Sequence, residues 1–190
     1  MRIVTFDIET IGGFTRGVWN ISDLEMTICC THDSATDEYD SFLKDDLPRL
    51  WKLLERTDVL VGFNSDHFDI PVLNKYYPGD LTKMRSIDLL SEVSASLGRR
   101  VKLDSIAAGT LGTKKSGSGL DAMRWWREGN IKKLREYCLK DVEITKKIFD
   151  YALKNNSLKY KELGRVKDVK LDTTKWLLGE GRALTQTLGF

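Results

Sequence analysis

The 190-residue sequence has few of the residues and segments that mark extracellular or membrane proteins. Its three cysteines are Cys29, Cys30 and Cys138. The first two are adjacent and the count is odd, which excludes a disulfide framework and the spacing of a zinc site. No apolar run approaches the ~20 residues of a membrane span, and no basic region followed by an apolar core opens the chain. We therefore expect a cytoplasmic protein that makes no membrane contact.

The remaining composition, 41% hydrophobic and 31% charged, is that of a globular protein, and the length fits one domain with a small appendage. The net charge of +2 hides an asymmetry. Residues 1–60 contain 6 Lys/Arg and 12 Asp/Glu, residues 61–150 contain 16 and 12, and residues 151–190 contain 8 and 4. This pattern suits a protein that holds cations in one place and phosphates in another, and it equally suits ordinary solvated faces.

Residues 2–10, Arg-Ile-Val-Thr-Phe-Asp-Ile-Glu-Thr, form the segment around which the fold is expected to be organised. The short run of strand-forming residues predicts a buried central strand. Because alternate side chains of a strand share a face, Asp7 and Glu9 project the same way, about 7 Å apart along the backbone. Two like charges on a buried strand repel each other and are costly to remove from water unless a cation lies between them. The alternative is that both acids lie at the solvated end of the strand. A divalent cation is the natural candidate in the first case.

The spacing of apolar residues in the rest of the sequence predicts an α/β domain with a central mixed sheet flanked by helices. An antiparallel meander comes first, and a helix and a parallel strand follow in a β-α-β crossover. Glycines between the first two strands predict a loop or a loose hairpin at 11–23. We expect a domain at 1–154 and a basic appendage at 155–190, formed by a hairpin and a short helix that pack on or beside it. The other predicted strands are 24–31, 36–42 and 59–63, with 86–90 a strand or a helix start, and the predicted helices are about 45–56, 64–77, 91–98, 103–109, a segment ending near 129, and 131–154.

Two later segments supply further polar residues. Asn64 and Asp69 follow the predicted strand 59–63, and loops at the carboxyl ends of parallel strands are where α/β folds place their sites. Asp69 can therefore join Asp7 and Glu9, or it can be a first-turn acid favoured by the helix dipole, with Asn64 only a cap.

Tyr137 and Asp141 are four residues apart on the predicted helix 131–154, so they share one face. They form either part of a site or a hydroxyl-carboxylate pair that only packs. The glycine- and serine-rich segment 111–119 contains Lys114 and Lys115. It is either a mobile linker or a phosphate-binding loop that uses backbone N–H groups and charge.

The ordered set of these motifs resembles a known family. Asp7-Ile8-Glu9-Thr10, then Gly62-Phe63-Asn64 through Phe68-Asp69, then Tyr137 to Asp141 are similar to the three motifs of the DEDD 3′-to-5′ exonucleases in their tyrosine subclass. These enzymes have the ribonuclease H-like fold and include the proofreading domain of family B DNA polymerases. The resemblance covers roughly residues 1–153.

The resemblance implies a metal-dependent hydrolase with two Mg²⁺ or Mn²⁺ ions, the hard cations that carboxylates favour, whereas a zinc-type His/Cys cluster is missing from the sequence. Asp7 would bridge both ions, Glu9 and Asp141 would complete their ligands, and Asp69 would hold the second ion largely through water. Tyr137 would orient the attacking water.

The resemblance also implies residues that bind the substrate. Thr10 and Ile11 would contact the terminal nucleotide, while Asn64 and Phe68 would steer the 3′ end. His67 lies two residues before Asp69, which does not match the histidine subclass, and we interpret it as a loop residue.

The predicted function is a stand-alone exonuclease that removes nucleotides from the 3′ ends of single-stranded DNA or RNA, with DNA favoured. We expect it to stand alone because 190 residues leave no room for a polymerase domain. Lys114, Lys115 and residues 155–190 are candidates for backbone contacts. A ribonuclease and a non-catalytic nucleic-acid-binding or docking module remain alternatives, and the sequence indicates no particular protein partner.

Overall fold

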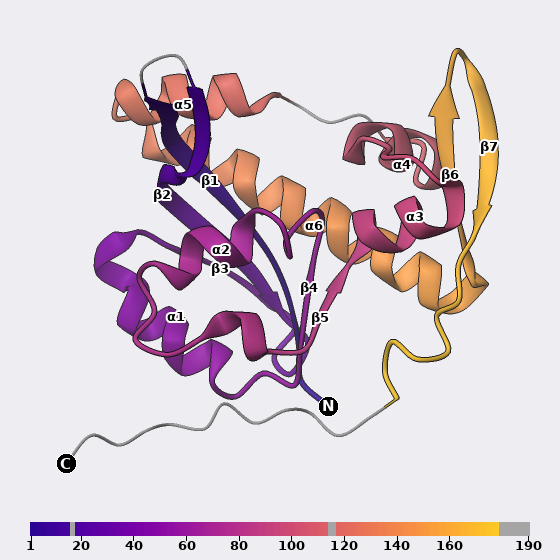
Figure 1. Ribbon diagram of the computed structural model, residues 1–190, viewed down its shortest axis with the longest axis horizontal. Coiled ribbons are helices and arrows are strands. Elements are labelled where there is room, and N and C mark those ends of the chain that lie inside the picture. Colours follow the sequence, from indigo (N-terminus) through magenta and orange to yellow (C-terminus); the bar gives the residue numbers. More distant parts are fainter. Residues whose placement is uncertain (16–17, 114–116, 179–190) are drawn as a thin grey trace.

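The structure, a computed structural model, describes residues 1–15, 18–113 and 117–178. Within these ranges a five-stranded sheet of order β3-β2-β1-β4-β5 forms the centre, with helices on both faces (Figure 1). β2 pairs antiparallel with β1 and β3, whereas β4 runs parallel to β1 and β5 runs parallel to β4. The predicted mixed sheet, a meander followed by parallel strands, is therefore confirmed. Its strands are β1 (Ile3–Thr15), β2 (Val18–Asp33), β3 (Glu38–Phe42), β4 (Val59–Gly62) and β5 (Ser86–Asp88).

The two faces of β1 are buried against different helices. Val4, Phe6 and Ile8 belong to the core that the sheet shares with α1 and α2. The residues between them face α6, the long helix that crosses β1, β2 and β4. No helix of the described ranges is long and apolar enough to cross a membrane. The helices are α1 (Leu47–Leu54), α2 (Asp69–Asn74), α3 (Leu89–Leu97), α4 (Leu103–Thr110), α5 (Gly119–Arg127) and α6 (Ile131–Asn155).

The first hairpin is longer than the sequence predicts. β1 continues to Thr15 and β2 already begins at Val18, where glycine content favours a loop or a loose hairpin. Gly12 and Gly13 have φ angles of 94° and 87°, and the register shifts twice, between Glu9 and Thr10 and again beyond Gly12. A Cβ on Gly12 would come within 2.7 Å of the carbonyl oxygen of Asp23. These glycines let the paired strands bend while they continue to pair.

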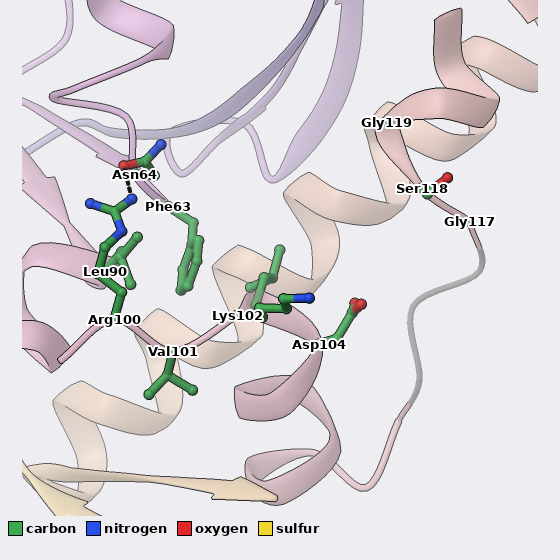
Figure 2. A pocket seen from close by; sticks show the side chains of 11 residues that line it. Phe63, Asn64, Leu90, Arg100, Val101, Lys102, Asp104, Gly117, Ser118 and Gly119 are labelled. Atoms are coloured by element: carbon green, nitrogen blue, oxygen red, sulfur yellow. Dashed lines mark hydrogen bonds between the residues drawn. The ribbon is translucent and has the colours of Figure 1, made fainter. Parts of the chain in front are cut away.

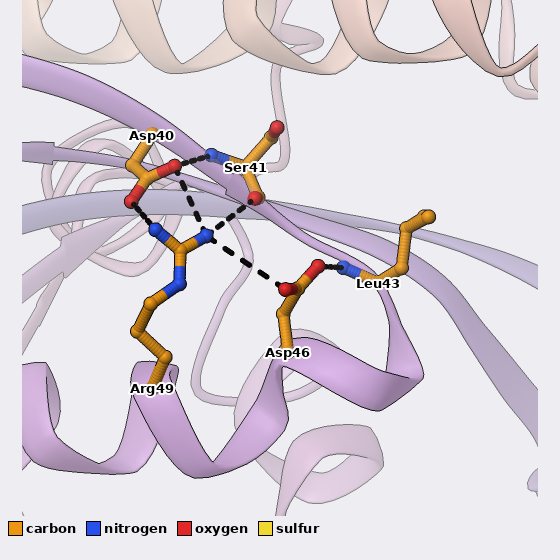
Figure 3. Close-up of polar contacts among 5 residues, drawn as sticks. All are labelled: Asp40, Ser41, Leu43, Asp46 and Arg49. Atoms are coloured by element: carbon orange, nitrogen blue, oxygen red, sulfur yellow. Dashed lines mark hydrogen bonds and ion pairs between the residues drawn. The ribbon is translucent and has the colours of Figure 1, made fainter.

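Helix α1 is joined to the edge strand β3 by a small polar network. Arg49 Nη1 donates to Asp40 Oδ2 at 2.8 Å, and the Asp46 carboxylate accepts from the backbone N–H of Leu43 at 3.0 Å (Figure 3). The guanidinium group of Arg49 also lies 4.7 Å from the ring centroid of Phe42. Because these ion pairs are exposed, they fix the orientation of the helix more than they stabilise the fold.

The turn after β4 positions the residues that join this strand to α2. Pairing between β1 and β4 ends at Thr5 and Val61, and the chain turns after Gly62. A Cβ on Gly62 would lie 2.4 Å from the Cβ of Ser65, so the turn requires glycine there. Asn64 then takes a φ of 66°, and its backbone N–H donates to the buried carboxylate of Asp88 at 2.7 Å.

The segment after α6 packs back on the fold. β6 (Ser157–Glu162) and β7 (Arg165–Lys170) form a hairpin against α4, and Trp176 stacks on Phe149 of α6 with ring centroids 5.8 Å apart. The short helix predicted for the last residues falls partly on 179–190, which lie outside the described residues. The division into 1–154 and 155–190 stays a prediction.

Candidate metal centre

β1 and α6 bring three carboxylates together. Asp7 and Glu9 project from the face of β1 that α6 covers, and Asp141 lies on the helix face turned toward them. One carboxylate oxygen from each of the three residues lies within 4.8 Å of the others. Glu9 and Asp141 are buried and Asp7 is half-buried. The alternating geometry of a strand and a crossing helix thus gathers residues 132 to 134 positions apart in the sequence.

The chemistry of this donor set fits a hard divalent cation. Three carboxylates at this separation repel one another when ionised, and a bound cation removes that cost. Carboxylate oxygens are the ligands that Mg²⁺ and Mn²⁺ prefer. The thiol of Cys138 lies nearby, with Sγ 3.5 Å from the carbonyl oxygen of Asp7 and 3.8 Å from its Oδ2. Burial raises the pKa of this thiol well above its ordinary value, so Cys138 stays neutral beside the carboxylates and is not a thiolate ligand.

Asp69 lies in the same cavity but outside the close group of three. It is the first residue of α2, is only 4% exposed, and accepts a hydrogen bond from the backbone N–H of Ile8 at 3.0 Å. Burial raises the pKa of Asp69 to about 7, while the hydrogen bond from Ile8 opposes that shift. A nearby cation would lower this pKa again and favour the carboxylate.

Tyr137 is one turn before Asp141 on α6, as predicted, and is buried. Its ring lies edge-on to Trp125 with centroids 5.7 Å apart. A Cβ on Gly117 would lie 3.1 Å from its Cε2 atom, so the ring has close neighbours on two sides. Packing therefore fixes the direction in which the phenol group points.

A cavity of about 710 Å³ opens above these residues. The acids Asp7, Glu9, Asp69 and Asp141 line it, and so does Tyr137. Of the residues predicted to contact substrate, Thr10, Asn64 and Phe68 line this cavity, whereas Ile11, although described, does not. Lys114 and Lys115 lie outside the described residues. His67 is exposed on the turn after β4, with Nδ1 3.9 Å from the carboxylate of Asp88.

Sequence reasoning missed the contribution of α5 to this cavity. Leu120, Met123 and Arg127 line it, and α5 packs beside β1 and α6. The available signal was the spacing of these residues at three and four positions, which places them on one helix face.

Asp88 is a second residue that the sequence analysis missed. Its buried carboxylate accepts from the backbone N–H groups of Asn64, Asp66 and Leu90, so it holds the turn after β4 and caps α3. The signal was an aspartate directly before the Leu-Leu pair that starts the helix.

Comparison with known proteins identifies the class. Residues 4–153 match the model of the RNase H superfamily, so the chain belongs to this superfamily, whose members are generally hydrolytic nucleases. A family B DNA polymerase from the hyperthermophilic archaeon Pyrobaculum calidifontis has a similar structure, with a TM-score of 0.61 and 19% sequence identity over 80% of this chain. The match covers 24% of that polymerase, and at this identity it shows the fold alone. No protein of curated function gave a significant match.

Proposed function

We propose that the chain is a metal-dependent 3′-to-5′ exonuclease of the DEDD type, in the tyrosine subclass, that acts on single-stranded nucleic acid and favours DNA. The observation that carries the proposal is the close group formed by Asp7, Glu9 and Asp141 in a cavity that Asp69 and Tyr137 also line. Membership of the RNase H superfamily supports a hydrolytic nuclease.

Asp7, Glu9 and Asp141 are the residues that would hold two Mg²⁺ or Mn²⁺ ions, with Asp69 beside them. Such ions would acidify a water molecule and neutralise the negative charge that develops on the phosphate oxygens. Tyr137 would donate or accept a hydrogen bond that aims the attacking water, because a phenol with an ordinary pKa near 10 is a weak general base. Its packing against Trp125 suits this role, since a fixed ring gives a fixed direction.

The shape of the cavity supports a single-stranded end as substrate. Its volume of about 710 Å³ is within the range of pockets that enclose one small ligand, such as an unstacked nucleotide. Leu24, Leu120 and Met123 line the same cavity as the carboxylates and would supply apolar contacts for a base, while the carboxylates and their metal ions would surround the phosphate. Thr10 and Asn64 supply polar groups for the terminal sugar and phosphate.

Cleavage of 5′-labelled single-stranded DNA and RNA oligonucleotides, with Mn²⁺, Mg²⁺ or EDTA, tests the proposal. Wild type should produce a ladder that shortens from the 3′ end, and EDTA or the Asp7→Ala change should abolish it. The exposed aspartate Asp45, which does not line the cavity, gives a matched control, and Asp45→Ala should cleave normally.

The alternatives are separate outcomes of the same experiment. Preferential shortening of RNA would make the protein an exoribonuclease. Binding of either oligonucleotide without cleavage under any metal condition would contradict the enzyme and favour a non-catalytic nucleic-acid-binding module.

A further inference from the structure

A second cavity adjoins the candidate metal centre. Its volume is about 640 Å³, and it lies between the turn after β4, the segment before α4 and the start of α5 (Figure 2). It shares Phe63, Asn64, Ser118 and Gly119 with the cavity that contains the acids. The two cavities are therefore neighbouring parts of one cleft, divided at Phe63 and Asn64.

The second cavity differs from the first in its chemistry. None of the four acids lines it, and its charged residues in the described part of the chain are Arg100, Lys102 and Asp104. Arg100 and Lys102 are exposed, and Arg100 Nη2 donates to the side-chain Oδ1 of Asn64 at 2.6 Å. Figure 2 shows the guanidinium group of Arg100 beside Asn64, at the border of the two cavities.

The wall between these charges is apolar. Phe63, Leu90, Val101 and Leu103 line the cavity, and the ring of Phe63 lies between Arg100 and Lys102 (Figure 2). An aromatic ring with cationic side chains on both sides suits a nucleotide, because the ring can stack on a base while the cations contact phosphates. The single carboxylate, Asp104, leaves the lining of this cavity with one more positive than negative side chain.

The arrangement also gives the cleft a direction. The cavity with the acids has four carboxylates and one exposed cation, Arg127, in its lining, so with metal bound it suits the phosphodiester bond to be cleaved. The second cavity has two exposed cations and one carboxylate in its lining, a balance that suits the phosphates of a strand that continues beyond the acids. A strand whose last phosphodiester bond lies at the acids therefore has its upstream part in the second cavity.

We propose that the second cavity is a subsite for the nucleotide upstream of the scissile phosphate, with Arg100 and Lys102 contacting phosphate oxygens and Phe63 stacking on the base. The proposal rests on the proposed exonuclease function and deepens it, because it assigns the residues that make the enzyme prefer longer strands. Arg100 is the central contact, since its bond to Asn64 holds it at the border where the two nucleotides meet.

The neighbouring residue provides a matched control. Arg99 is the same type of residue and is also exposed, but its Nη2 atom donates to Glu162 of the hairpin β6–β7 at 2.8 Å. Arg99 does not line either cavity. Removal of Arg99 therefore changes the net charge by the same amount without altering the proposed subsite.

The test compares 5′-labelled oligothymidylates of two and five nucleotides and measures kcat/KM for each. We expect wild type to favour the five-nucleotide strand, Arg100→Ala to lower this preference by about tenfold, and Arg100→Lys to keep most of it because the charge remains. Arg99→Ala should retain the wild-type preference.

A loss of kcat/KM in Arg100→Ala that is equal for both strand lengths would indicate that Arg100 only holds Asn64, and it would overturn the proposal. A preference no lower in Arg100→Ala than in Arg99→Ala would overturn it as well.

Binding separates this proposal from the proposed function. Fluorescence anisotropy measures the affinity for the same oligonucleotides in Ca²⁺ at several salt concentrations. For the five-nucleotide strand, a plot of log affinity against log salt concentration should have a slope that is smaller in magnitude by about 0.7 in Arg100→Ala than in wild type. If wild type binds but never cleaves and this loss is present, the enzyme proposal fails, and what stands is the second cavity as a nucleotide-binding site that uses Arg100. If wild type cleaves and neither the length preference nor the salt slope changes, the subsite fails and the enzyme proposal stands.

Discussion

The backbone N–H of Ile8 donates a hydrogen bond to Oδ1 of Asp69 at 3.0 Å, which joins the first residue of α2 to the strand that carries Asp7 and Glu9. The bond is made beyond the point where pairing of β1 with β4 ends, so a side chain takes the place of a neighbouring strand. It positions a buried carboxyl group next to the candidate metal centre, and burial raises the pKa of that group to about 7.

This pKa predicts how stability depends on pH. Without metal, folded Asp69 keeps a proton up to about pH 7, whereas an unfolded aspartate loses it near pH 4, so the folded state binds more protons between these values. The contribution of Asp69 to stability is therefore fully present below about pH 4 and is lost as the pH rises toward 7. We expect Asp69→Asn, which keeps the oxygen acceptor, to become more stable relative to wild type over this range, by at most ~4 kcal/mol. Urea denaturation in EDTA at pH 4, 5.5, 7 and 8 measures this difference, and parallel curves for the two proteins would contradict it.

The acid cluster predicts a metal-dependent stability. We expect millimolar Mg²⁺ or Mn²⁺ to raise the Tm of wild type, because a ligand that binds only the folded state stabilises it, and Asp141→Asn to lose most of this shift. Without metal the variant should be at least as stable as wild type, since one of three mutually repelling carboxylates becomes neutral. Calorimetry with and without metal tests both expectations. An equal shift in wild type and variant would place the bound ion elsewhere.

Tyr137→Phe separates the hydroxyl group from the ring. We expect kcat to fall by about tenfold with little change in KM, because the attacking water loses an orienting hydrogen bond while substrate contacts remain. Stability should change little, since the ring keeps its packing against Trp125. Steady-state kinetics beside Tyr151→Phe, a change on the same helix away from the cavity, provides the measurement. An unchanged kcat in Tyr137→Phe would refute the role in orienting water.

The contact between α4 and the C-terminal hairpin predicts a destabilised variant. A Cβ on Gly109 would lie 2.5 to 2.6 Å from backbone atoms of Tyr160, so Gly109→Ala must push the hairpin away from α4. We expect a loss of about 1–3 kcal/mol, as is usual for overpacking. A Cβ on Gly119, in the first turn of α5, would meet nothing within 4 Å, and Gly119→Ala should be neutral or slightly stabilising. Urea denaturation of both variants tests the contrast, and equal stabilities would show that the hairpin gives way freely.

Several features could be predicted from the sequence because they depend on local chemistry. The run Ile-Val-Thr-Phe predicts β1, and its alternation puts Asp7 and Glu9 on one face. The spacing of Tyr137 and Asp141 puts both on one face of α6. Asn64 and Asp69 could be assigned to the carboxyl end of β4 because a β-α-β crossover fixes the direction of that strand.

The length of the first hairpin could not be predicted in the same way. Its glycines favour a loop when each is considered alone, whereas pairing with β2 and the close approach of Gly12 to Asp23 make them part of a bent strand. Asp88 and Arg127 were missed for a related reason, since their partners and the cavity they border come from distant segments.

The sequence by itself determined which side chains are carboxylates and on which side of their own strand or helix each one lies, because strand and helix periodicity are local properties of the backbone. Only the tertiary structure decided that α6 crosses β1 where three of those carboxylates come within 4.8 Å, and that Asp69 stays outside that group with a raised pKa. It also decided that Arg100 borders the cleft while Arg99 pairs with Glu162. These distances and burials depend on how whole elements pack, and packing is set by contacts between residues far apart in the chain.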